Sequence, residues 1–200
     1  MTLPHSEPSE ALINLDAVLP AMERRAELSM LPDERARILN LAGDMCFDAG
    51  QRERALHFYD RSIDTYLNAG LYAAGVAVCQ KVVRLTPEVI RARCTLAWMA
   101  IARGMLEEAR ERIRDYAEAA RRLSDARIAW GHLRMMAEVC ESHEVLETLA
   151  EALMQLGDVR GADRVYGAAL GGELRQRKLP EQADERWKVV MERIMTPRVN

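Results

Sequence analysis

The sequence lacks any long apolar run. The longest clean run is LAWMAIA at 96–102, far shorter than the roughly 18 residues that a membrane-spanning helix needs. The first ten residues, MTLPHSEPSE, lack the basic patch and apolar core of a secretory signal. Both absences argue against an exported or membrane-inserted protein, and we expect a cytoplasmic one.

Cysteine and aromatic residues are also scarce. The four cysteines, Cys46, Cys79, Cys94 and Cys140, form no CxxC pair, which argues against a metal site or a disulfide framework. We expect reduced thiols packed as small hydrophobic residues. Aromatics make up 5% of a chain that is 49% hydrophobic, so its apolar mass comes mainly from helix-forming residues. A net charge of −3 leaves no basic excess for a nucleic-acid backbone.

Catalytic motifs are missing as well. The sequence contains no GxSxG, no phosphate-binding loop and no GxGxxG. SHEVLE at 142–147 begins like a HExxH zinc helix, but Glu147 stands at the second ligand position. We interpret it as a helix start, with Ser142 at the N-cap and Glu144 in the first turn. The sequence therefore predicts no enzyme, no cofactor and no metal.

What is present is a series of helical segments. Apolar residues recur every three or four positions, as in Ile38, Leu41 and Met45, and nothing from about residue 30 to 195 is typical of a strand. Segments of ordinary helix length are separated by predicted breaks at Gly50, Gly70, Pro87, Gly104, Ser124, Ser142, Gly157 and Gly171–Gly172. We predict an all-α fold of about eight to ten short antiparallel helices.

The segments also repeat. AGQRERALHFY (49–59), RGMLEEARERI (103–113) and LGDVRGADRVY (156–166) each place Ala five residues after Gly and a large apolar residue four further on. The glycines, Gly50, Gly104 and Gly157, recur at almost equal spacing. In a frame that begins at Ala36, the first unit supplies Leu39, Ala42, Gly43, Ala55 and Tyr59.

On these residues the chain resembles the tetratricopeptide repeat family over about residues 36–176. The resemblance implies a right-handed superhelix of stacked helix pairs with a concave face. Because offset frames also fit, the helix between Gly50 and Gly70 would belong to two units, and the period would be three helices rather than two. This arrangement is similar to the SNAP-like members of the family and to some bacterial proteins. The chain departs from the motif in lacking its tryptophan and in having Cys46 and Ala100 where Tyr is usual.

The two ends of the array are predicted to differ from its middle. Residues 1–35 would form an acidic, partly disordered arm with one or two short helical turns, interrupted near Pro20. Residues 177–200 would form a capping helix, from Pro180 to about Met195, and a tail. Trp187, Val190 and Ile194 lie on one stripe of that helix, which could cap the last repeat or form a homodimer.

The resemblance also indicates which residues would face a groove. They are the first-helix positions of three units. Among them, Trp98 is either an interface anchor or a residue packed between helices. The positions are Arg37, Asn40, Asp44 and Phe47 in the first unit, Arg91, Cys94 and Trp98 in the next, and Glu144, Glu147 and Glu151 in the last.

We therefore expect a binding function, through a groove or an edge, for a protein or peptide partner. The chain would be an adaptor, scaffold or assembly factor; the alternatives are a secretion or assembly chaperone and, less favoured, a ligand- or peptide-sensing regulator. Residues 141–158 contain five acidic residues and no Lys or Arg, whereas 171–180 lean basic. Such an imbalance either steers a charged partner or is ordinary surface variation.

Overall fold

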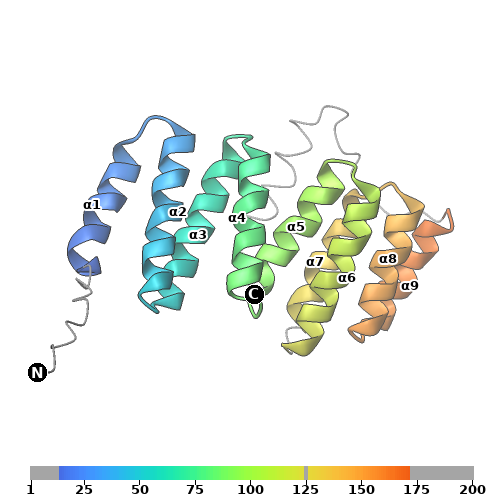
Figure 1. The fold of residues 1–200 in the computed structure, drawn as a ribbon. Coiled ribbons are helices and arrows are strands. Elements are labelled where there is room, and N and C mark those ends of the chain that lie inside the picture. The colour runs from blue at the N-terminus through green and yellow to red at the C-terminus, as the bar shows by residue number, and fades with distance from the viewer. Residues whose placement is uncertain (1–13, 124–125, 172–200) are drawn as a thin grey trace, which may run out of the picture. The chain divides into compact units, whose positions relative to one another are not determined.

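The computed structural model describes residues 14–123 and 126–171, and over these residues the protein is all-α (Figure 1). It divides into two compact units, 1–62 and 63–200, and the boundary falls within the third helix. The helices are α1 (Leu15–Leu28), α2 (Pro32–Asp48), α3 (Arg52–Asn68), α4 (Tyr72–Leu85), α5 (Ile90–Ala102), α6 (Leu106–Arg122), α7 (Ala126–Val139), α8 (His143–Gln155) and α9 (Val159–Ala169).

The helix bounds confirm a period of three helices. Helices α3, α6 and α9 begin at positions 52, 106 and 159, so they follow one another at almost equal spacing. Helices α4 and α7, at 72–85 and 126–139, have equal lengths and are separated by the same interval as α3 and α6. The repeated unit is therefore longer by one helix than a simple helical hairpin.

The same turn closes the first helix of each period. Gly50, Gly104 and Gly157 all have positive φ, at 75°, 68° and 85°, a conformation that costs glycine little. After each glycine, the next residue's N–H donates to a carbonyl five residues back, with N–O distances of 2.8, 3.0 and 2.9 Å. This is the Schellman-type end of a helix, and it explains why glycine spacing reveals the period.

The N-terminal unit contains α1, α2 and the beginning of α3. The expected interruption near Pro20 is wrong, because α1 runs unbroken from Leu15 to Leu28 with Pro20 inside it. Proline removes one backbone hydrogen bond of the helix, but Leu19 and Ala26 are buried and hold α1 in place. Arg35 of α2 adds hydrogen bonds to the carbonyls of Ala26 and Ser29, at 3.1 and 2.9 Å.

Helix α3 packs through two different sets of residues, as the overlapping frames predict. In the N-terminal unit, the Tyr59 ring lies against Gly43 of α2, so closely that a Cβ on Gly43 would be 2.6 Å from it. In the second unit, Leu67 lies against Gly75 of α4, where an added Cβ would be 2.8 Å from Leu67. Missing side chains on the neighbouring helices thus let each half of α3 approach closely.

The residues at the positions of Gly43 and Tyr59 change from one period to the next. One period later the equivalent positions hold Ala97 and Ile113, both buried, so alanine replaces glycine and isoleucine replaces tyrosine. In the third period the equivalent positions hold Ala150, which is buried, and Tyr166, which is 48% exposed. When alanine occupies the position of Gly43, an isoleucine at the position of Tyr59 is buried, whereas a tyrosine at that position remains at the surface.

The second unit, beyond residue 62, places α5 and α8 among several neighbours. Helix α5 packs against α4, α6 and α7, and α8 packs against α6, α7 and α9. Ten of the thirteen residues of α5 are buried, on every side of the helix. By contrast, α6 buries only one stripe and pairs its outer charges along the helix: Arg110 with Glu107, Arg112 with Glu108 and Arg122 with Glu118.

The predicted end segments are only partly described. Residues 1–13 of the expected arm, the capping helix from Pro180 and the stripe of Trp187, Val190 and Ile194 lie outside the described residues.

Candidate protein-binding surface

The predicted groove residues occupy equivalent repeat positions but different environments. Positions 37, 91 and 144 correspond to one another, as do 44, 98 and 151. The same face is half-buried on α2, mostly buried on α5 and fully exposed on α8. Only α8 therefore presents the whole predicted face at the surface.

On α2, in the N-terminal unit, the predicted residues are largely engaged. Arg37 is exposed, while Asn40, Asp44 and Phe47 are half-buried. Asp44 accepts a hydrogen bond from the Tyr59 hydroxyl at 2.6 Å. Burial, followed by this hydrogen bond, raises the pKa of Tyr59 well above its ordinary value, so the hydroxyl remains a donor.

On α5 the predicted anchor is not accessible. Trp98 is 1% exposed and packs between helices, which is the second of the two interpretations of this residue. Arg91 is exposed, and its guanidinium forms an ion pair with Asp64 of α3 at 3.0 Å. Both side chains are thus occupied within the fold.

Helix α8 carries a continuous exposed acidic stripe. Glu144, Glu147 and Glu151 follow one another at i, i+3 and i+7, and all three are exposed. Met154, three residues further, extends the stripe and is 49% exposed. Within the described ranges none of the three carboxylates forms an ion pair. The opposite side of α8 is apolar and buried, so the stripe is held outward.

Polar contacts on three sides fix the orientation of α8. Arg110 of α6 donates to the Thr148 hydroxyl at 3.3 Å, and that hydroxyl donates to the Glu144 carbonyl at 2.9 Å. Trp130 of α7 donates through its indole N–H to the Leu156 carbonyl at 3.0 Å. The imidazole Nδ1 of His143 donates to the carbonyl of Ala169, so the start of α8 contacts the end of α9.

An ion pair between buried Asp158 and partly exposed Arg134 secures the connection from α8 to α9. Asp158 is 4% exposed, caps α9 by accepting from the Gly161 N–H at 3.1 Å, and binds the Arg134 guanidinium with two hydrogen bonds. Burial pushes the pKa of this carboxyl upward, but the hydrogen bonds from Arg134 and Gly161 outweigh it, so the pKa lies below its ordinary value. The carboxylate thus serves structure rather than proton transfer.

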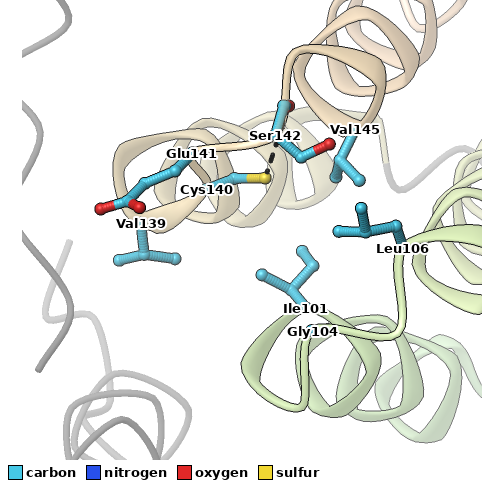
Figure 2. A pocket seen from close by; sticks show the side chains of 8 residues that line it. All are labelled: Ile101, Gly104, Leu106, Val139, Cys140, Glu141, Ser142 and Val145. Atoms are coloured by element: carbon cyan, nitrogen blue, oxygen red, sulfur yellow. Dashed lines mark hydrogen bonds between the residues drawn. The ribbon is translucent and has the colours of Figure 1, made fainter. Parts of the chain in front are cut away.

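A small pocket lies beside the start of α8 (Figure 2). Its volume is about 130 Å³, and it lies between the turn that follows α5 and the turn that precedes α8. In Figure 2 the apolar side chains of Ile101, Leu106 and Val145 surround it, and the Cys140 thiol donates to the Ser142 carbonyl at its wall. Glu141 belongs to the lining and is exposed. The pocket has room for about one apolar side chain.

The cysteine thiols are unreactive at neutral pH in the folded protein. All four are buried and outside any disulfide, as expected from their apolar surroundings. Burial raises the pKa of Cys94 to about 12 and that of Cys140 to about 11, so almost no thiolate is present at neutral pH. The pocket therefore contains no activated nucleophile at Cys140.

Two other kinds of functional feature are absent from the part of the chain that the structure describes. Among the described residues, no group of three His, Cys, Asp or Glu side chains gathers closely enough to hold a metal ion. No helix within them is long and apolar enough to cross a membrane.

No family model matches the chain, and no curated protein matches it.

Sequence reasoning missed the pocket and the Arg134–Asp158 pair. The pocket combines residues of two turns that are far apart in the sequence, and no spacing rule links them. Asp158 did carry a signal, since aspartate directly after a turn glycine and before a helix is a favoured N-cap. Nothing in the sequence indicates its partner, Arg134.

Proposed function

We propose that this protein is a non-enzymatic, cytoplasmic interaction module that binds another protein on the outer face of α8 and the adjacent pocket. It would act as an adaptor, scaffold or assembly factor. The observation that carries the proposal is the stripe of Glu144, Glu147 and Glu151, which is exposed, rigidly presented and without ion pairs among the described residues. Charges left unpaired along one face favour a partner of opposite charge.

The repeat architecture supports the proposal. A tetratricopeptide-like array exposes first-helix positions to partners, and here α8 presents all three of those positions while α5 buries two of its three. The three-helix period observed in the helix bounds agrees with a SNAP-like member of that family. The pocket beside Glu141 supplies the apolar component that an acidic stripe alone lacks.

The test compares partner capture by two charge-matched variants. The tagged full chain is expressed in its native cells and purified under mild conditions with its bound proteins. The first variant neutralises the stripe (Glu144→Gln, Glu147→Gln, Glu151→Gln). The control neutralises three exposed carboxylates on other helices (Glu27→Gln, Glu53→Gln, Glu111→Gln) and changes the net charge equally.

We expect one protein to be captured by the wild type and the control but strongly reduced with the stripe variant. Equal capture by both variants would show that α8 is not the binding face. Turnover of a substrate by the purified chain, with no protein captured, would contradict the non-enzymatic assignment.

A further inference from the structure

We propose that the basic segment 173–179, Glu-Leu-Arg-Gln-Arg-Lys-Leu, occupies the α8 surface of its own chain. Its cations would pair with the acidic stripe, and one of its leucines would enter the pocket. The inference rests on the proposed function, because the segment would compete there with the protein partner. It gives the surface a built-in occupant that a partner must displace.

The position at which the described chain ends leaves this surface within reach of the segment. The Ala169 carbonyl at the end of α9 accepts from His143, the first residue of α8, which directly follows the pocket residue Ser142. Lys178 lies nine residues after Ala169, a distance that extended chain spans over about 30 Å. Glu144 and Glu151 are seven helical residues apart, or about 10 Å, so the stripe is within reach.

The charges of the two segments are complementary. Residues 173–179 contain Arg175, Arg177 and Lys178 against a single acidic residue, Glu173. Between Glu141 and Asp158 the chain contains no Lys or Arg. Arg110 on the neighbouring helix α6 is already paired with Glu107 and bonded to Thr148. The stripe therefore has no cation of its own on α8.

Tethering makes weak contacts effective. An exposed ion pair contributes only about 0.2–1 kcal/mol, which would not hold a free peptide. A short flexible connection raises the local concentration of the segment to the millimolar range. Leu174 and Leu179 flank the cations, and the Ile101, Leu106 and Val145 walls can receive one of them.

Zero-length carbodiimide cross-linking of the purified full chain tests the proposal, because the chain has three lysines, Lys81, Lys178 and Lys188. We expect Lys178 to become joined to Glu144 or Glu147 within the monomer. Reversing Arg175 and Arg177 to Glu leaves both reacting groups in place, and it should lower that yield roughly fivefold or more. Cross-links formed by Lys188 serve as the internal control.

The outcomes distinguish the chain's own segment from a second copy of the chain as the occupant of the α8 surface. A mixture of isotopically light and heavy chains shows whether a link joins two copies; links only between unlike chains would overturn the proposal in favour of a second copy. Lys178 links spread over exposed carboxylates such as Glu111 would also overturn it. Changing Leu174 and Leu179 to Ala should lower the yield several-fold, and an unchanged yield would remove the pocket from the proposal. Because no partner is present, the result is independent of partner capture.

Discussion

Replacing Gly43 with Ala should destabilise the protein, although alanine is the better helix former. The new Cβ would lie 2.6 Å from Cδ1 and Cε1 of Tyr59, a ring that is 1% exposed and has no room to move. Overpacking of this kind costs about 1–3 kcal/mol, and the gain in helix propensity offsets about 1 kcal/mol of it. We expect a net loss of up to about 2 kcal/mol in the free energy of unfolding.

A matched control is available at Gly167 in α9, where an added Cβ meets nothing within 4 Å. There, Gly167→Ala should stabilise by about 0.5–1 kcal/mol. Urea unfolding followed by circular dichroism measures both variants. The difference between them isolates the Tyr59 contact, because the propensity gain is common to both.

The second period suggests a rescue of the same contact. Its equivalent pair is Ala97 and Ile113, so Tyr59→Ile should restore the fit of Gly43→Ala. The double-mutant cycle should then give a favourable coupling of about 1 kcal/mol or more. Additive effects, or a Gly43→Ala variant as stable as Gly167→Ala, would refute the repeat-packing account.

Two further predictions concern buried groups. Asp158→Ala should lower the free energy of unfolding by about 2–4 kcal/mol, because it removes an N-cap and a charge-assisted contact to Arg134. The control Asp163→Ala, on the exposed side of α9, should change the free energy of unfolding by about 0.5 kcal/mol or less. Because the folded pKa of Asp158 is depressed, its contribution is complete above the unfolded value of about 4 and is lost as pH falls through the lower folded value. The Asp158→Ala penalty in urea unfolding should thus shrink below about pH 4, and a pH-independent penalty would contradict the ion pair. With a thiol reagent at neutral pH, all four cysteines should react only after unfolding, since they are buried; rapid native labelling of Cys140, located by mass spectrometry, would show that its thiol is not shielded.

The fold was predictable because its signals are local. Glycine with positive φ is required at Gly50, Gly104 and Gly157, and the sequence displays that requirement directly. A small residue at the position of Gly43 and a large apolar residue at that of Tyr59 likewise recur at fixed offsets. The continuity of α1 was not predictable, since it depends on tertiary burial of Leu19 and Ala26 that outweighs the local effect of Pro20.

The candidate site was predictable only in part. Three glutamates at helical spacing indicate an exposed stripe, and Glu144, Glu147 and Glu151 are exposed on α8. For Trp98 a signal was present, because LAWMAIA is hydrophobic on every side, as is typical of a buried helix. The pocket could not be predicted, because Ile101 and Val145 meet only through the packing of separate turns.

The most direct test of the binding surface is the affinity of the captured partner for purified wild-type chain and for the two charge-matched triple variants. Loss of three exposed ion pairs, at about 0.2–1 kcal/mol each, should weaken binding by the Glu144, Glu147 and Glu151 triple variant roughly three- to 150-fold. The control triple variant should bind within about twofold of wild type. Equal dissociation constants for all three proteins would contradict the assignment of α8 as the binding surface.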